Sequence, residues 1–178
     1  MARTVSQAAV RLIKSFESLS LKPYLCPAGV WTIGYGHTEG VKKTTSQITE
    51  LQAETILVDD LDQFAAAVES MVKVPLSENQ FGALVSFAFN AGKGALASST
   101  LLKKLNAGDY DAVPAQLMRW NKARKNGQLV EMAGLTRRRI AEGALWLEGA
   151  KPLPKLSMPQ TAMSVEDFAE HLNQGAVS

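Results

Sequence analysis

The longest helical pattern in the chain lies between Thr49 and Pro75, and it constrains the fold more than any other feature. Apolar residues recur there at three- and four-residue spacing, at Leu57, Leu61, Phe64, Val68 and Met71. This spacing predicts one helix over about residues 50–73, and Thr49 with Gln52 forms a possible capping box at its start. A helix of ~22 residues is roughly 33 Å long. In a chain of 178 residues, a helix of that length is expected to be a spine that joins two lobes.

The segment before this helix changes from helical to strand character. Residues 17–38 read ESLSLKPYLCPAGVWTIGYGHT, and a Pro-Ala-Gly turn at 27–29 separates two short runs, 22–26 and 30–35. Aromatic and β-branched residues on either side of such a turn predict a small antiparallel hairpin. The chain therefore begins with a lobe that contains both helix and strand.

Glu17 stands where the first helical pattern ends. Ala9, Leu12, Ile13 and Phe16 recur at helical spacing, and Glu17 falls at the margin of the face they form. Partial burial favours the protonated form of a carboxylate. A carboxyl that keeps its proton near neutral pH can act as a general acid. The alternative is an ordinary solvated glutamate in the last helical turn.

Beyond the spine, the sequence predicts a helical C-terminal lobe over about residues 76–149. Ser77 with Gln80 forms a second possible capping box before a strongly apolar helix. The predicted elements of this lobe are helices at 81–90, 100–105, 110–120 and 136–148, and a basic hairpin or loop at 124–128. Residues 151–178 begin with Lys-Pro-Leu-Pro-Lys, which predicts a stiff linker followed by a short C-terminal helix.

Eight residues separate Glu17 from Cys26, and five separate Cys26 from Thr32. This spacing resembles the Glu–Asp/Cys–Thr triad of the phage-type lysozymes, the endolysins of glycoside hydrolase family 24. WTIGYGHT around Thr32 resembles the strand-and-glycine signature of that family. The likeness continues in LSENQFGALVSFAFNAGKGAL and GLTRRRIAEGALW, and it covers about residues 6–149. The resemblance implies an α+β, mainly α, lysozyme-like fold with two lobes, a catalytic domain over 1–150 and an N-terminal lobe over about 1–50.

The resemblance also implies an activity, which is hydrolysis of the β-1,4 bond between N-acetylmuramic acid and N-acetylglucosamine in peptidoglycan, causing host lysis. Glu17 would be the general acid, and Cys26 and Thr32 would position or activate water. Because a thiol is largely neutral at pH 7, Cys26 departs from the carboxylate version of the triad, and a packing role stays open. A cysteine hydrolase that uses Cys26 and His37 is disfavoured, because Pro27 has no N–H to stabilise a thiolate.

Four further residues take roles from the resemblance. Phe89 and Asn90 fall where the family's cleft residues lie and would contact substrate, although Phe89 could equally be part of the core. His37 would be structural, ordering the hairpin through a hydrogen bond or a carboxylate pair. Arg137 is expected to point inward and neutralise Glu17, with Arg138 as the alternative.

Composition limits the partners. The formal charge of +2 gives no reason to expect nucleic acid, and one cysteine excludes an intramolecular disulfide. Two histidines, His37 and His171, are far apart in sequence, so no metal or other cofactor is expected. The N-terminus lacks the apolar run of a signal peptide or membrane anchor.

We therefore expect a monomer that waits in the host cytoplasm. It would reach the glycan strands of peptidoglycan in the periplasm through a separate pore-forming protein. Two alternatives remain, a lytic transglycosylase that forms anhydromuramic ends and a non-catalytic wall-binding lysis protein.

Overall fold

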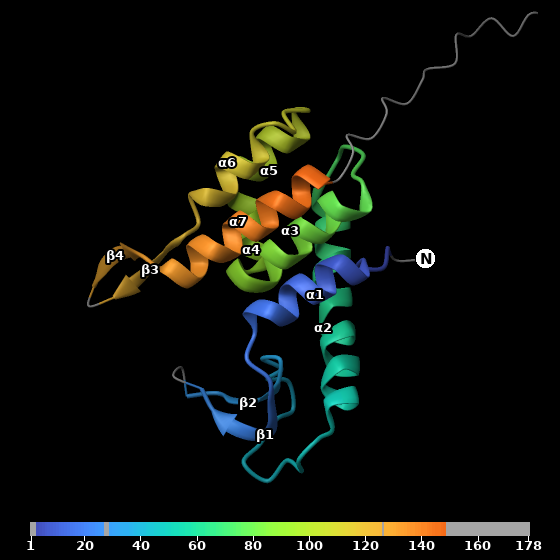
Figure 1. Ribbon diagram of the computed structural model, residues 1–178, viewed down its shortest axis with the longest axis vertical. Helices are drawn as coiled ribbons and strands as arrows, with labels where there is room; N and C mark the ends of the chain where they lie inside the picture. The colour runs from blue at the N-terminus through green and yellow to red at the C-terminus, as the bar shows by residue number, and fades with distance from the viewer. Residues whose placement is uncertain (1–2, 27–28, 126, 149–178) are drawn as a thin grey trace, which may run out of the picture.

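The computed structural model describes residues 3–26, 29–125 and 127–148, and they form a mainly helical α+β fold (Figure 1). The β1–β2 hairpin lies beside one end of the long helix α2, and most of the other helices gather at its opposite end. The elements in chain order are α1 (Gln7–Phe16), β1 (Ser20–Leu25), β2 (Trp31–Gly34), α2 (Glu50–Met71), α3 (Glu78–Ala91), α4 (Lys93–Ser98), α5 (Thr100–Asn106), α6 (Val113–Met118), β3 (Lys122–Lys125), β4 (Gln128–Glu131) and α7 (Ala133–Glu148).

The long helix predicted over about residues 50–73 is present as α2, a single helix of 22 residues. Its start is fixed by the predicted capping box, in which the Gln52 N–H donates to Thr49 Oγ1 at 3.2 Å and the Thr49 N–H donates to Gln52 Oε1 at 2.8 Å. One stripe of the helix is buried, comprising Ala53, Leu57, Leu61, Ala65 and Val68. The other faces remain in contact with solvent, because the helix bridges the hairpin and the helical lobe instead of crossing a core.

The predicted hairpin is also confirmed, although β1 begins two residues earlier than expected, at Ser20. Tyr24 pairs with Thr32 in antiparallel register. After β2 the chain turns back, and Ile33 and His37 exchange both backbone hydrogen bonds, at 2.9 and 3.0 Å. Gly34 lies against α2 in a left-handed conformation with φ +65°, which favours glycine. The hairpin is thereby seated on the spine.

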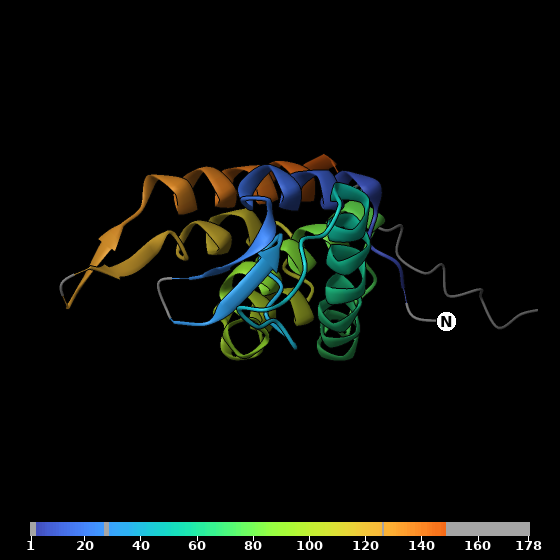
Figure 2. The same cartoon turned by 90° about the horizontal axis from the view of Figure 1, so that it is seen from below.

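Helix α3 is the centre of the helical lobe. Every residue from Gln80 to Ala88 is buried, because α1, α2, α4 and α7 all pack against it. The approach to α1 is close, because a Cβ added at Gly82 would lie 2.5 Å from the Cβ of Ala9. Figure 2 shows α1 and α7 side by side in one layer. The first helix in sequence therefore packs with the last one.

Differences from the predicted elements occur mainly after α3. Helix α4 was not predicted, and the helix expected at 110–120 is only Val113–Met118, with Pro114 in its first turn. The helix expected at 136–148 starts earlier, at Ala133. The basic segment at 124–128 lies in an antiparallel hairpin, β3–β4. The predicted linker and short helix within 151–178 lie outside the described residues.

Candidate active site

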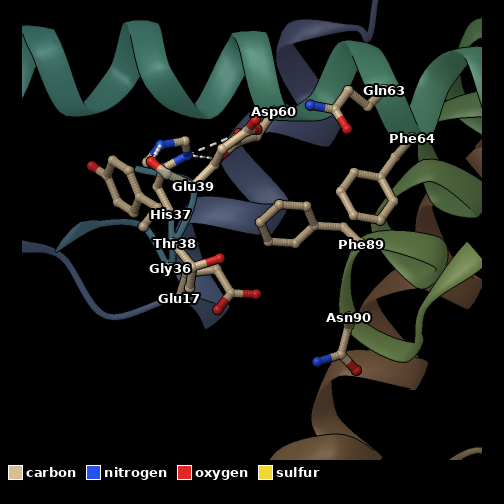
Figure 3. A pocket seen from close by; sticks show the side chains of 11 residues that line it. Glu17, Gly36, His37, Thr38, Glu39, Asp60, Gln63, Phe64, Phe89 and Asn90 are labelled. Atoms are coloured by element: carbon tan, nitrogen blue, oxygen red, sulfur yellow. Dashed lines mark hydrogen bonds and ion pairs between the residues drawn. The ribbon is translucent and has the colours of Figure 1, made fainter. Parts of the chain in front are cut away.

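A hollow of about 400 Å³ opens between the hairpin side of the molecule and the helical lobe. Glu17 lines this hollow from the end of α1, and residues 35–39 line it from the loop after β2. Helix α2 contributes Asp60, Gln63 and Phe64, and the end of α3 contributes Phe89 and Asn90. Figure 3 shows these side chains around the opening. Groups from four segments of the chain therefore meet at one concave surface, which is the usual geometry of a ligand site.

Glu17 is the C-cap residue of α1, with an extended backbone, and its N–H donates to Ile13 O at 3.1 Å. Its side chain is 23% exposed, so it is partly shielded from water and still accessible. Arg138 donates from Nη1 to Glu17 Oε1 at 2.5 Å. The hydrogen bond from Arg138 involves only this oxygen of the carboxylate.

The arginine that meets Glu17 is Arg138, so the prediction that Arg137 would take this position was wrong. Arg137 is exposed, whereas the Arg138 side chain is 4% exposed. On α7, residues four and seven places after Arg138 are Glu142 and Leu145, which are both buried. The corresponding residues after Arg137 are Ala141, which is half-buried, and Ala144, which is exposed. Leu145 and Glu142 therefore mark the face of Arg138 as the buried face of α7.

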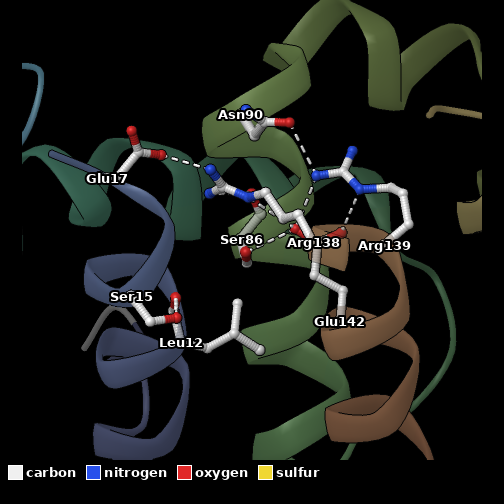
Figure 4. Close-up of polar contacts among 8 residues, drawn as sticks. All are labelled: Leu12, Ser15, Glu17, Ser86, Asn90, Arg138, Arg139 and Glu142. Carbon is white, nitrogen blue, oxygen red and sulfur yellow. Dashed lines mark hydrogen bonds and ion pairs between the residues drawn. The ribbon is translucent and has the colours of Figure 1, made fainter. Parts of the chain in front are cut away.

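Beneath Arg138 lies a buried cluster of charges that the sequence analysis did not anticipate (Figure 4). Glu142 Oε1 accepts hydrogen bonds from Ser86 Oγ at 2.7 Å, Arg139 Nη2 at 2.9 Å and Arg138 Nε at 3.3 Å. Burial raises the pKa of Glu142, and the two guanidinium groups oppose that shift. Burial also lowers the pKa of Arg139. The sequence did contain a signal, since Arg138, Glu142 and Leu145 share one helical face.

The two predicted substrate-contacting residues lie beside Glu17 in the first hollow. Arg139 Nη2 donates to Asn90 Oδ1 at 2.9 Å, which fixes the amide. The Phe89 ring packs edge-on against Phe64, with ring centroids 5.2 Å apart. Lys93 Nζ lies 4.8 Å from the centre of the Phe64 ring. Phe89 therefore lies at the edge of the hydrophobic core and also lines the first hollow.

His37 connects the loop after β2 to the spine. Its Nδ1 lies 3.0 and 2.9 Å from the two carboxylate oxygens of Asp60, and its Nε2 lies 2.9 Å from Glu39 O. The expected carboxylate pair is thus present, and its partner belongs to α2. Because His37 also lines the first hollow, this contact fixes one wall of it.

Cys26 and Thr32 are placed differently from Glu17. Thr32 is 3% exposed, and its hydroxyl donates to Val30 O at 3.1 Å. Cys26 is half-buried directly after β1, and its N–H donates to Val30 O at 3.0 Å. Neither residue lines the hollow that contains Glu17. The structure therefore brings Glu17, His37, Phe89 and Asn90 to one surface, and it places Cys26 and Thr32 in the adjoining hairpin.

A second hollow, of about 570 Å³, lies on another side of Glu17, between the end of α1 and the start of α7. Glu17 and Asn90 line both hollows, and Phe16, Met132 and Arg137 contribute to the second one alone. Glu17 is consequently accessible from two directions. A long ligand could pass across it.

The described residues contain no group of three or more His, Cys, Asp or Glu side chains arranged to hold a metal ion. Within the same residues, no helix has the length and apolar character needed to cross a bilayer.

Comparison with known proteins gives concordant matches. The profile of the phage lysozyme family matches residues 14–142. The endolysin of Acyrthosiphon pisum secondary endosymbiont phage 1 is 46% identical over 142 residues, which cover 80% of this chain and 97% of that protein. The endolysin of Bacillus phage B103 is 43% identical over 82% of this chain, which spans only 54% of that relative. Among solved structures, the muramidase domain of SpmX from Asticaccaulis excentricus superposes with a TM-score of 0.78 at 39% identity, over 84% of this chain and 99% of that one.

Proposed function

This chain belongs to the phage lysozyme family and is an endolysin that degrades the peptidoglycan of the cell wall, and from that premise we propose the bond it cleaves and the residues that act. The bond is the β-1,4 linkage between N-acetylmuramic acid and N-acetylglucosamine, and the reaction is hydrolysis. The observation that carries the proposal is the partly exposed Glu17, held by Arg138 at the meeting point of two hollows.

Glu17 is the general acid in this proposal. Cleavage of a glycosidic bond requires a proton for the departing oxygen, and a carboxyl within reach of that oxygen can supply it. Arg138 fixes one oxygen of Glu17, which leaves the other directed to the ligand.

Cys26 and Thr32 are proposed to position or activate the water that completes the reaction. The Thr32 hydroxyl uses its proton on Val30 O, so its lone pairs remain able to accept a hydrogen bond from water. Cys26 is half-buried and directly follows the neighbouring strand β1 of the same hairpin. Neither residue lines a hollow that Glu17 lines, so this role rests on the spacing of the triad in the sequence.

Phe89 and Asn90 are proposed to contact the glycan strand. The edge and face of an aromatic ring provide an apolar surface for a sugar, and an amide that is held by Arg139 presents donors in a fixed orientation. Catalysis by a monomer and release through a separate pore-forming protein stay predictions.

The experiment is Glu17→Gln, tested on purified peptidoglycan with product analysis by mass spectrometry. The amide keeps the shape of the side chain but cannot donate a carboxylic proton, and a general acid contributes about 10²- to 10⁴-fold in rate. The variant should therefore retain less than about a hundredth of the activity, while Glu69→Gln, on an exposed part of α2, should match the parent. Residual activity above a tenth of the parent would remove Glu17 from the mechanism.

The same product analysis separates hydrolysis from the alternative reaction. Hydrolysis leaves a reducing muramic acid end, whereas a lytic transglycosylase leaves an anhydro end. Anhydro products from the parent enzyme would replace the proposed reaction with transglycosylation. Absence of any cleavage by the folded parent would favour a wall-binding role.

A further inference from the structure

We propose that Glu142, which does not reach the cleft, is a positioning residue for both Glu17 and Asn90. It holds Arg138 against Glu17 and Arg139 against Asn90, and its negative charge limits how strongly the two arginines draw the proton from Glu17. This inference rests on the proposed role of Glu17 as general acid.

The carboxylate of Glu142 is buried and is held by several hydrogen-bond donors. Its side chain is 0% exposed, and Oε1 receives three hydrogen bonds, from Ser86, Arg138 and Arg139. Its Oε2 forms an ion pair with Arg139 Nε at 2.9 Å. A carboxylate with this many donors has little freedom to rotate, so it can fix the two guanidinium groups that surround it.

Each guanidinium carries the constraint on to a residue of the cleft. Arg138 uses Nε for Glu142 and Nη1 for Glu17, and its Nη2 lies 3.4 Å from Ser86 O. Arg139 Nη2 donates to Glu142 Oε1 and to Asn90 Oδ1, while its Nε is in an ion pair with Glu142 Oε2 that has no hydrogen-bond geometry. Glu142 is thus linked to Glu17 through Arg138 and to Asn90 through Arg139.

The charges of this cluster balance. Glu17 and Glu142 carry two negative charges when ionised, and Arg138 and Arg139 carry two positive ones. Without the charge of Glu142, the arginines would present an uncompensated positive charge to Glu17, and a nearby positive charge favours an ionised carboxylate. Glu17 would then lose its proton at lower pH, and the general acid would be absent sooner as pH rises.

Other charged groups face Glu17, but Glu142 does not contact them. His37 and Glu39 from the loop after β2 and Asp60 from α2 lie across the first hollow, and Arg137 lies across the second. Their charges are the same in the parent and in variants of Glu142. A change in the pH dependence of activity in a Glu142 variant therefore reports on the cluster of Arg138, Arg139 and Glu142.

Stability alone gives little reason for a charged group at this position. Replacing a buried ion pair by well-packed apolar residues is often neutral or stabilising, because desolvation offsets much of the attraction. The arrangement does fit a requirement for fixed geometry and balanced charge at Glu17. A purely structural role would affect unfolding, but it would not move the pH dependence of catalysis.

The test is the pH profile of kcat/KM, whose alkaline limb reports the loss of the essential acid in the free enzyme. In Glu142→Gln the limb should shift to lower pH by roughly 0.5 to 1 unit, because the arginines are then uncompensated. In Arg139→Gln it should shift to higher pH. The double variant restores the balance, so its limb should return to within about 0.2 unit of the parent, and Glu148→Gln, at the exposed end of α7, should not move it.

The outcomes separate this inference from the proposed function. If Glu17→Gln is inactive and the limb is unmoved in folded Glu142→Gln, the inference is overturned and the proposed acid stands. If Glu17→Gln stays active, the proposed acid fails and the inference fails with it.

A charge-preserving variant keeps the test open if the neutral substitutions do not fold by circular dichroism. Glu142→Asp retains the charge but is one methylene shorter, so it cannot hold both arginines in place. Its alkaline limb should stay at the parental pH while kcat falls at least about threefold, since small misplacements at a site are costly. A parental kcat in Glu142→Asp would refute the positioning role.

Discussion

Substitution of Gly82 by alanine tests whether the close contact between α1 and α3 supports the site. Gly82 lies inside α3, and a Cβ placed there would be 2.5 Å from the Cβ of Ala9 on α1. Real Cβ atoms do not approach so closely. Ala9 has no flexible end that could move aside, so the two helices would have to separate.

Two effects of opposite sign decide the magnitude. Alanine is favoured over glycine inside a helix by about 1 kcal/mol, whereas overpacking a core costs roughly 1–3 kcal/mol. Because the obstruction is the first side-chain atom of a buried residue, we take the upper end of that range. The expected net loss is about 2 kcal/mol, which corresponds to a decrease in Tm of about 4–8 °C for a chain of this size.

Activity should fall further than stability alone would explain. Glu17 follows α1 directly, so a displaced α1 moves the acid away from Arg138, and a misplacement of about 1 Å at a reacting group can cost on the order of 10²-fold in rate. Tm is measured by circular dichroism, and activity is measured on purified peptidoglycan well below Tm. The double variant Ala9→Gly/Gly82→Ala should recover part of both, because it removes the obstructing methyl group.

Gly143 in α7 provides the matched control. A Cβ there would lie 3.7 Å from the Cβ of Pro114, which is an ordinary contact. Gly143→Ala should therefore stabilise the protein by up to about 1 kcal/mol through helix propensity. If Gly82→Ala raised Tm as Gly143→Ala does, α1 would not be held rigidly against α3, and the reasoning would be refuted.

Three further predictions concern the hairpin, the spine and the surface. Cys26→Asp should retain substantial activity in the peptidoglycan assay, whereas Cys26→Ala should lose at least about tenfold, or ~1.4 kcal/mol in transition-state stabilisation; a fully active alanine variant would assign the thiol to packing. His37→Asn should lower the free energy of unfolding in urea by about 1 kcal/mol through loss of the bond to Asp60, and the effect should disappear in an Asp60→Ala background. The hydrogen bond from Lys104 lowers the pKa of Asp109 below its ordinary value of 3.8, so its stabilisation exists at neutral pH and is lost as pH falls. Asp109→Asn should accordingly lower Tm slightly at pH 7, and the difference from the parent should vanish in acid below that value; an equal difference at both pH values would contradict this.

The elements set by local sequence were predictable. Both capping boxes, at Thr49 and Ser77, start helices as expected, because a cap satisfies backbone N–H groups within four residues of itself. The β1–β2 hairpin follows from a turn flanked by aromatic and β-branched residues. Helix α4 was missed because its six residues are too few to show a period.

Parts of the site depend on tertiary contacts that periodicity cannot supply. Sequence patterns treat arginine and glutamate as surface residues, so the burial of Arg139 and Glu142 was not foreseen. The choice between Arg137 and Arg138 depended on where α7 begins and which face meets α3. The roles of Cys26 and Thr32 in catalysis stay predictions.

The placement of α1 has a consequence for the synthesis of the enzyme. Glu17 emerges early from the ribosome, but its partner Arg138 is separated from it by 121 residues. Helix α1 packs on α3 and α7, so the surroundings of Glu17 remain incomplete until translation has passed the end of α7. A nascent chain that ends before α7 therefore carries the carboxyl without a finished cleft, and the cleft is complete only once the residues of α7 have been synthesised.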